Sequence, residues 1–574
     1  MPQTKQCKQC SQEFQITDDD LEFLKKVSPI LQGQTILISP PTLCPTCREI
    51  KRLCWRNERS LYKRKSDKSG REIVSIYSPD KTDYQVYDIS EYQSDEFDPM
   101  SFGQEYDFSK SFFAQYDELL HKVPRKASNT TRNENSDYCN QTWQTKDSYL
   151  CFNVGYAENC LYCTEAFHVK NCVDCFDIRD CEYCYSCFDC VNCNKSKYIE
   201  HCRDCFECYF IYDCLGCKNV VLSSGLHNKQ YVFENKQLTK EEYEERVKNI
   251  DFSSRAAMDE LKKRFEELKK SAIHRENNNI SSENCTGDYL IECKDCTDCY
   301  NALKSEGCKR VAGIDDASRD CRDMNIITEA ELCYEGTSVT GHKNLLSVFV
   351  VYGSDNIYCN FCENCNNCFG CVGLNHKQYC ILNKQYAKDE YEKLLAKTIE
   401  KMKEDNEWGE FFPMSISPFG YNEALVNAYH PKSKDEAKKL GAKWQDNDYS
   451  LQYQGEFYAP KDSIKEYVAS NDEVKNLLNG VLECETSGKA FKVMPQEIAF
   501  YMEHNIPVPS KHSEIRYEEL FKKRNPRKLH HRQCMCEESG HDHGGRCPVE
   551  FETTYAPDRP EKIYCENCYQ KSVI

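Results

Sequence analysis

Two Cys-x-x-Cys pairs stand near the start of the chain with the spacing of a metal site. The first pair is Cys7 and Cys10, and the second is Cys44 and Cys47. Each pair places two thiolates at one corner, and a structural Zn²⁺ binds four ligands in a tetrahedron. The sequence therefore predicts a four-cysteine zinc site. Cys54 lies outside this set and is expected to pack in a core.

The C-terminal tail offers a second set of zinc ligands. One Cys-x-x-Cys pair and a third cysteine supply three thiolates, and the fourth ligand is left open among a histidine and two further cysteines. The predicted ligands are Cys536, His543, Cys547, Cys565 and Cys568, with Cys534 as an alternative. One zinc at each end gives an expected content of about two Zn²⁺ per chain.

The cysteines of residues 139–226 follow a repeat instead of a ligand pattern. From Cys151 to Leu226 a cysteine or another small or aliphatic side chain recurs at every third position, and a period of twelve lies over it. Neither a helix nor a half-buried strand carries a period of three. Twelve residues with four inward positions are typical of one coil of a narrow β-solenoid.

Three interpretations of these cysteines stay open. The first is a core in which Cys acts as a small buried hydrophobe, and the sequence favours it. The second is multinuclear zinc or iron–sulfur binding, and the third is disulfides between coils. Because nothing at Met1 resembles a signal peptide, we expect a reducing cytoplasmic location, which disfavours disulfides.

The chain contains an internal repeat that predicts a second solenoid. Residues 225–243 match residues 373–391 at a constant offset of 148. The second copy is less regular, with a one-residue slip between Ala317 and Cys321. A charged helical segment follows each block and is expected to cover its open sheet edge.

Residues 484–532 repeat the N-terminal domain with a damaged metal site. Only Cys484 and His512 remain at the four ligand positions, because Ser487 and Ile515 replace the other two cysteines. Two ligands cannot complete a tetrahedral zinc site, so this copy is predicted to fold without metal.

Two basic segments interrupt a chain whose net charge is −18. Residues 48–71 hold ten Lys or Arg against three acidic residues, and residues 511–532 hold eight against three. Positive charge beside a zinc domain, with aromatic residues among it, is typical of a nucleic-acid surface, although a structural role explains it equally well. The candidate RNA contacts are Arg52, Arg56, Arg59, Lys63, Arg64, Lys65, Lys523, Arg524 and Arg527.

Several stretches resemble known bacterial proteins. The segment CKQCSQEFQITDDDLEFL, followed by CPTCR, resembles the bacterial "probable zinc-ribbon" treble-clef family. The Cys-rich middle, the SPFGYNE segment and the tail from RQCMC to CPVEFETTYAPDRPEKIYCENCYQ are similar to a group of uncharacterised cysteine-rich bacterial proteins with several zinc knuckles. The resemblance implies zinc as the metal and implies no activity.

These patterns predict a multidomain, mainly β protein with two Cys-rich β-solenoid (β-helix) blocks, helical caps and terminal treble-clef or zinc-ribbon domains. The predicted segments are a treble-clef zinc domain (1–62), a hairpin and helix connector (63–138), solenoid block 1 (139–236), a helical cap (237–278), solenoid block 2 (279–385), a second helical cap (386–412), a small α/β module (413–480), a degenerate treble clef (481–532) and a zinc ribbon (533–574).

The sequence favours a non-enzymatic zinc scaffold that binds RNA or a ribonucleoprotein through its basic ends. The alternative is a protein–protein scaffold that uses the solenoid faces, and a metal or iron–sulfur redox protein is the third hypothesis. No GxGxxG, P-loop, HExxH or Ser/His/Asp arrangement stands in a recognisable context, so no small-molecule substrate is identified. No apolar run is long enough to predict a membrane span.

Overall fold

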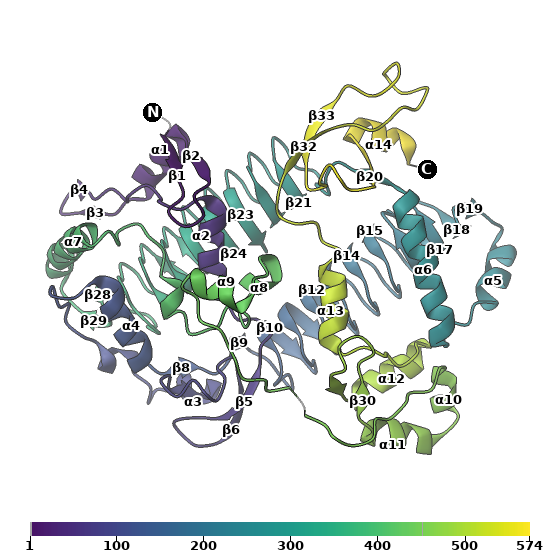
Figure 1. Cartoon of the computed structure of the whole chain (residues 1–574), viewed down its shortest axis with the longest axis horizontal. Coiled ribbons are helices and arrows are strands. Elements are labelled where there is room, and N and C mark those ends of the chain that lie inside the picture. Colours follow the sequence, from purple (N-terminus) through teal and green to yellow (C-terminus); the bar gives the residue numbers. More distant parts are fainter. Residues whose placement is uncertain (1–2, 451, 574) are drawn as a thin grey trace.

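The computed structural model describes residues 3–450 and 452–573 and contains two large ladders of parallel strands (Figure 1). We call residues 130–237 block 1 and residues 287–385 block 2. Block 1 contains β9 (Thr130–Thr131), β10 (Asn140–Lys146), β11 (Phe152–Glu158), β12 (Thr164–Lys170), β13 (Phe176–Arg179), β14 (Phe188–Val191), β15 (Glu200–Arg203), β16 (Tyr209–Tyr212), β17 (Lys218–Ser224), β18 (Gln230–Phe233) and β19 (Lys236–Gln237). Block 2 contains β21 (Gly287–Ile291), β22 (Cys299–Leu303), β23 (Lys309–Ile314), β24 (Arg322–Glu331), β25 (Tyr334–His342), β26 (Val348–Ser354), β27 (Asn360–Glu363), β28 (Cys380–Ile381) and β29 (Lys384–Gln385).

Neighbouring strands follow one another in sequence and pair at the predicted period. Phe152 lies opposite Thr164, and Thr164 lies opposite Phe176, twelve residues further on. In block 2, Val311 lies opposite Met324, so one turn there holds thirteen residues. This longer turn is the one-residue slip predicted before Cys321. The fold is therefore multidomain and mainly β, with sheets of parallel strands.

Nearly every inward residue of the ladders is preceded by a residue in the left-handed backbone region. Asn192 and Lys195, for example, have φ of 53° and 49° and stand directly before Cys193 and Ser196. Asn and Asp adopt this conformation more readily than other non-glycine residues. In addition, Asn192 Nδ2 donates a hydrogen bond to Asp204 Oδ1 at 2.6 Å, one period along the chain. The recurrent Asn or Asp before Cys thus has a backbone cause.

Small domains and helices surround the ladders. The N-terminal part contains β1 (Gln3–Gln6), β2 (Glu13–Ile16), α1 (Asp18–Val27), β3 (Ile30–Leu31), β4 (Gln34–Thr35), α2 (Pro45–Leu53), β5 (Tyr62–Lys65), β6 (Glu72–Ser75), β7 (Val86–Tyr87), α3 (Ile89–Tyr92), the 3₁₀ helix η1 (Pro99–Phe102), α4 (Phe112–Lys122) and β8 (Arg125–Lys126). The segments after the blocks contain α5 (Lys240–Lys248), α6 (Arg255–Ser271), β20 (Ile273–Arg275), α7 (Lys388–Glu404), η2 (Met414–Ile416), α8 (Val426–Tyr429), α9 (Lys434–Lys439), α10 (Ile464–Val468) and α11 (Asn471–Asn479). The C-terminal part contains β30 (Leu482–Glu483), β31 (Ala490–Phe491), α12 (Pro495–His504), α13 (Ser513–Phe521), β32 (His530–Gln533), β33 (Glu550–Thr553), β34 (Lys562–Tyr564) and α14 (Glu566–Ser572).

The helices after block 1 cover its side as well as its end. Helix α5 contacts the last parallel strand, β18, whereas α6 lies beside β16 and β17 (Figure 1). Met258, Leu261 and Phe265 of α6 are buried against outward aromatic residues such as Phe210. The inward cysteines form separate cores inside the two blocks, so each ladder has an inner thiol-rich core and an outer packed surface.

Candidate metal centres

The four N-terminal cysteines meet between a hairpin and a helix. Cys7 and Cys10 lie in the turn that joins β1 and β2, and Cys44 is the N-cap of α2, which carries Cys47 in its first turn. Their sulfur atoms all lie within 4.8 Å of one another, and Cys10 Sγ is 3.7 Å from Cys44 Sγ. A tetrahedral zinc with Zn–S bonds of about 2.3 Å holds its sulfurs about 3.8 Å apart. The group therefore fits a zinc ion.

The backbone of this turn favours the thiolate form of Cys7. Burial alone would raise the pKa of its thiol, but hydrogen bonds from the backbone of Cys10, Cys44 and Gln9 lower the pKa to about 6. The thiolate is the form that binds metal. Burial raises the pKa of the neighbouring Cys44 and Cys47 thiols, so the backbone hydrogen bonds favour Cys7 as the thiolate of the group.

A second four-cysteine group lies in the C-terminal domain. Cys534 follows β32, Cys547 precedes β33, and Cys565 is the N-cap of α14, which carries Cys568. All four are buried, and their sulfurs lie within 4.8 Å of one another. Cys547 Sγ is 3.9 Å from Cys565 Sγ, close to the spacing expected around zinc.

A third group shares one residue with the second. Cys536, His541, His543 and Cys568 also place their ligand atoms within 4.8 Å of one another. The structure therefore splits the predicted C-terminal ligands between two groups. Cys547 belongs to the four-cysteine group, whereas Cys536 and His543 belong to the group with two histidines. Cys534 takes the fourth position of the four-cysteine group, which the sequence left open.

The reason for this division is local. The Cys534 backbone N–H donates to Val549 O at 2.9 Å, which holds this cysteine beside the strand that follows Cys547. The loop of residues 537–546 instead folds back and places His541 and His543 beside Cys536. Sequence reasoning left His541 out of the ligand set, although its His-x-His spacing with His543 was a signal that could have included it.

The cysteines of the two blocks contact backbone carbonyls instead of forming ligand groups. Cys187 Sγ lies 3.4 Å from Tyr185 O and 3.5 Å from Ser196 O, and its single S–H can donate to either carbonyl. Ser196 occupies an inward position itself, and its Oγ donates to Asn194 O at 3.0 Å in the same way. Among the described residues, no three ladder cysteines lie close enough to hold a metal, and no cysteine forms a disulfide. This arrangement favours the interpretation of the ladder as a core.

The first basic segment is largely turned inward. Arg48 of α2 pairs with Asp323 at 2.9 Å and with Glu335 at 2.7 Å, and Arg52 pairs with the same Glu335 at 2.8 Å. All four side chains are buried. The helix that carries two metal ligands on one side is therefore tied to block 2 by its other side.

Arg56 and Arg59, two further candidate RNA contacts, have carboxylate partners as well. Arg56 is buried and pairs with Glu58 at 2.6 Å. Arg59 pairs with Glu514 of α13 at 2.9 Å, and its side chain is only 15% exposed. Both guanidinium groups are therefore already paired with carboxylates of the same chain.

The second basic segment also forms ion pairs, and their carboxylates lie in block 1. Arg524 is buried and lies 2.7 Å from both Glu165 and Asp177. Lys523 lies 2.7 Å from the buried carboxylate of Glu200. These contacts hold the end of α13 against the ladder.

Arginines at matching positions of the two basic segments contact different blocks. Arg48 of the N-terminal domain binds block 2, whereas Arg516 at the equivalent position binds Asp174 of block 1. The two domains also touch each other, because Arg527 lies 3.5 Å from Glu49. The duplication in the sequence thus reappears as two related docking contacts.

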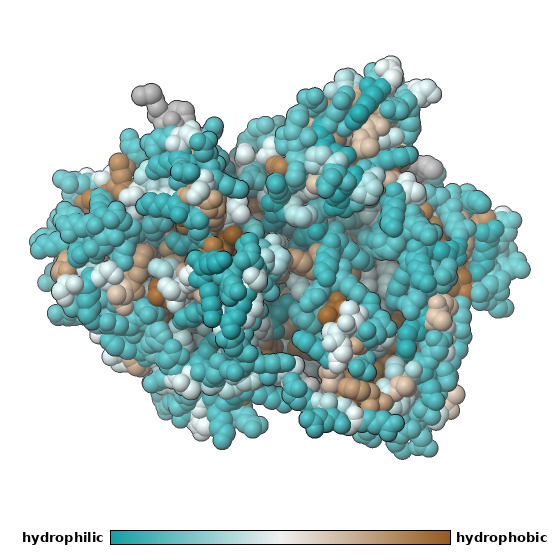
Figure 2. Space-filling model, viewed as in Figure 1, coloured by the Kyte–Doolittle hydropathy of each residue, from teal (hydrophilic) through white to brown (hydrophobic). Residues whose placement is uncertain are grey.

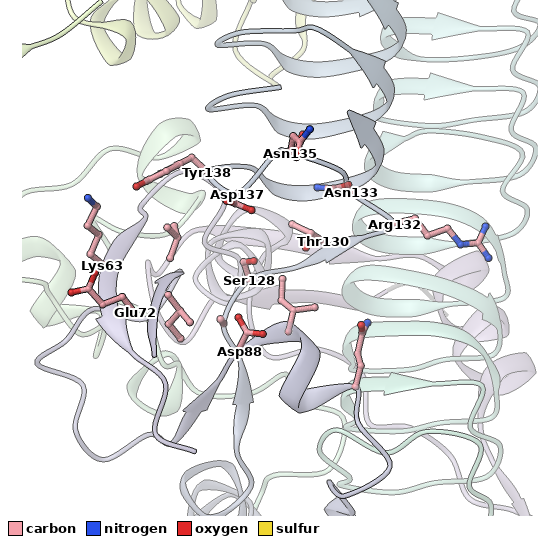
Figure 3. Close-up of a pocket in the computed structure, with 16 residues that line it drawn as sticks. Lys63, Glu72, Asp88, Ser128, Thr130, Arg132, Asn133, Asn135, Asp137 and Tyr138 are labelled. Atoms are coloured by element: carbon pink, nitrogen blue, oxygen red, sulfur yellow. The ribbon is translucent and has the colours of Figure 1, made fainter. Parts of the chain in front are cut away.

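The exposed positive charge of the first basic segment lies on the β5–β6 hairpin. Lys63 and Lys65 are exposed on β5, whereas Arg64 pairs with Asp67 at 2.9 Å. Lys63 borders an open polar cleft of about 610 Å³, which Arg132 also lines (Figure 3). Of the candidate RNA contacts in residues 48–71, these lysines keep their charge at the surface.

Comparisons with known proteins leave the family open. No protein-family model and no curated protein matches the chain. A solved structure described as a "putative acetyltransferase" from Desulfovibrio desulfuricans G20 aligns with 48% of this chain and 81% of its own length, at 8% identity and a TM-score of 0.11. Similarity at that level carries no argument about fold or activity. Among the described residues, no helix combines the length and apolar character needed to cross a bilayer.

Proposed function

We propose that this protein is a non-enzymatic scaffold of two β-solenoids, stabilised by zinc-binding terminal domains, that binds a partner protein on its solenoid faces. The solenoid assignment is supported by parallel pairing every twelve residues and by small inward side chains. The zinc assignment is supported by the four-sulfur groups at both ends, and a structural zinc contributes roughly 10–16 kcal/mol to folding. The treble-clef and zinc-ribbon assignments belong to the same proposal.

One observation carries the choice of a protein partner. Four largely buried arginines of the basic segments pair with carboxylates of the two blocks and so connect domains: Arg48, Arg52, Arg516 and Arg524. A charge that is already paired and buried offers little to phosphate groups. The face of the molecule shown in Figure 2 is largely hydrophilic, with apolar residues in small separate areas. A polar surface of this kind suits a reversible protein contact.

Block 1 offers an exposed polar face for such a contact. Along its ladder Lys146 pairs with Glu134 at 3.6 Å, and Lys170 pairs with Glu158 at 3.2 Å. All four side chains are between 47% and 64% exposed. Surface pairs of this type contribute at most about 1 kcal/mol each, so a partner can replace them at small cost.

Crosslinking of the full chain in its native cells tests the proposal. Amine-reactive crosslinks to one partner protein should form from Lys146 and Lys170 of the block 1 face. The matched control is Lys63 and Lys65 of the β5–β6 hairpin, which are also exposed. Partner crosslinks confined to the hairpin lysines would contradict binding by the solenoid faces.

RNA binding is the second candidate function, because Lys63 and Lys65 remain exposed beside an open polar cleft. Phosphate contacts predict an affinity that falls by roughly 0.7 log units per contact per log unit of salt for a single strand. The double variant Lys63→Ala and Lys65→Ala should then show a shallower salt dependence. A parent protein that binds no single-stranded RNA at low salt would exclude this candidate.

A further inference from the structure

The two C-terminal ligand groups share Cys568, and this sharing carries an inference beyond the scaffold proposal. Cys568 is 3% exposed, lies in the first turn of α14, and belongs both to the four-sulfur group and to the group with two histidines. Two separate mononuclear sites would need eight ligands, and the domain brings seven together here: Cys534, Cys536, His541, His543, Cys547, Cys565 and Cys568. Seven ligands complete two tetrahedra only if one of them serves both.

The histidines are oriented as metal ligands. His543 Nδ1 lies 2.8 Å from Gly545 O, and a carbonyl oxygen can only accept, so Nδ1 carries the proton. The unprotonated Nε2 then faces Cys568 Sγ at 3.4 Å. Metal-binding histidines characteristically donate their outer N–H to a carbonyl or a carboxylate.

His541 is placed in a similar way, with a carboxylate at ion-pair distance in place of a hydrogen-bonded carbonyl. Its Nε2 lies 3.6 Å from Glu538 Oε2, while its Nδ1 lies 3.1 Å from Cys536 Sγ. The side chain of His541 is only 8% exposed. Each histidine therefore directs one nitrogen to an acceptor outside the group and the other to a thiol inside it.

The loop that carries these histidines has no hydrophobic means of holding its shape. Residues 537–546 read EESGHDHGGR and contain no apolar side chain. Ordering ten such residues costs conformational free energy that no burial of apolar surface offsets. A metal ion that ties the loop to Cys536 and Cys568 supplies the missing stabilisation.

We propose that the C-terminal domain holds a binuclear zinc centre in which the Cys568 thiolate bridges the two ions. One Zn²⁺ is bound by Cys534, Cys547, Cys565 and the bridge, and the other by Cys536, His541, His543 and the bridge. Two ions that share a sulfur at about 2.3 Å each lie no more than about 4.6 Å apart. Five thiolates around two Zn²⁺ leave a net charge near −1. With the N-terminal site, the chain binds three zinc ions.

Metal analysis of the full-length chain, purified under reducing conditions without chelator, tests the count. The parent should contain three zinc ions per chain by elemental analysis and native mass spectrometry. His541→Ala should contain two, because it removes a ligand from the second ion only. The matched control His531→Ala, an exposed histidine paired with Glu550 and Glu552, should keep three.

A spectroscopic measurement tests the bridge separately. In the Co²⁺-substituted chain, two ions joined by one sulfur couple magnetically, so the electron paramagnetic resonance intensity should fall below that of three isolated ions. His541→Ala should restore the intensity of two isolated ions, and it alters only the polar loop. Cys568→Ser should weaken the retention of both C-terminal ions against a chelator. A parent with two zinc ions, an unchanged zinc content in His541→Ala, or three uncoupled Co²⁺ ions would each overturn the proposal.

Discussion

At the residue scale, the ladder cysteines act as small side chains that also donate hydrogen bonds. Cys184 is fully buried, and its Sγ donates to Cys193 O at 3.4 Å. Hydrogen bonds to Cys172 and Cys181, together with burial, raise the pKa of its thiol above the ordinary value. A protonated thiol fits both a thin core and the carbonyls that line it, which explains why Ser occurs among the same inward positions.

Substitutions at Cys184 should separate this role from metal binding. Cys184→Ser keeps a donor of similar size and should change the free energy of unfolding by about 1 kcal/mol. Cys184→Val removes the donor and adds volume, so it should cost about 1–3 kcal/mol. Denaturant unfolding under reducing conditions measures both. The loss of a metal equivalent in either variant would show that the ladder binds metal.

Glu200 provides a pH-dependent contribution to stability. This buried carboxylate on β15 lies 2.9 Å from Lys269 and 2.7 Å from Lys523. Burial would raise its pKa, but the two ammonium groups lower it to about 2. Because the folded pKa lies below the unfolded value of about 4.3, the contribution is present above that value and is lost as the pH falls towards 2.

The Glu200→Gln variant should therefore be less stable than the parent by about 3 kcal/mol at pH 6, and this difference should shrink as the pH is lowered from 4.5. Thermal unfolding across this range measures it. Glu292→Gln, an exposed glutamate on block 2, serves as the control and should show no such trend. An equal difference between parent and Glu200→Gln at pH 6 and pH 3 would contradict the assignment.

At the scale of elements, the ladders place a left-handed residue before nearly every inward position. Many of these residues are Asn or Asp, which tolerate the conformation, but others are not. Glu292, for example, has φ of 54° and is exposed. Its backbone N–H donates to Ile280 O at 2.9 Å, so a hydrogen bond to the preceding turn stabilises this strained backbone conformation.

Glu292→Asn should stabilise block 2, because Asn adopts the left-handed region at a lower cost than Glu. The expected gain is a few tenths of a kcal/mol to about 1 kcal/mol, measured as a higher denaturant midpoint with an unchanged slope. Glu306→Asn, at a strand-bridge position without positive φ, is the control. A gain of the same size in both variants would point to surface charge as its cause.

At the scale of the whole molecule, the domains that carry the cysteine groups are joined to the ladders by buried ion pairs. The N-terminal domain is attached to block 2 through Arg48 and Arg52, and removing one partner of a buried pair typically costs 3–5 kcal/mol. A metal ion bound by the N-terminal cysteines would therefore stabilise more than its own domain, because two of these cysteines belong to the helix that carries the arginines.

The Cys44→Ser variant should lose one zinc ion and make residues 1–62 sensitive to protease, while the interior of block 1 stays protected. The reason is that a structural zinc contributes roughly 10–16 kcal/mol, as much as the stability of a whole domain. Limited proteolysis with elemental analysis measures both effects. Cys54→Ser, at a buried cysteine outside the ligand group, is the control that should retain the full zinc content. Unchanged zinc and protease resistance in Cys44→Ser would contradict the four-cysteine site.

The sequence by itself determined the features that depend on local spacing. The Cys-x-x-Cys pairs predicted the sulfur groups at both ends, because two ligands three residues apart lie at one corner whatever the surrounding fold. The periods of three and twelve predicted parallel pairing between successive repeats, and the slip before Cys321 predicted the longer turn of block 2. These features repeat along the chain and are therefore visible without a structure.

Only the tertiary structure decided the features that join distant segments. The partners of Arg48 lie in block 2, far along the chain, so a basic segment that resembled an RNA surface is largely a set of buried domain contacts. Likewise, the sharing of Cys568 depends on how a polar loop returns to α14. Charge and ligand type are properties of single residues, but burial and coordination depend on which residues the fold brings together.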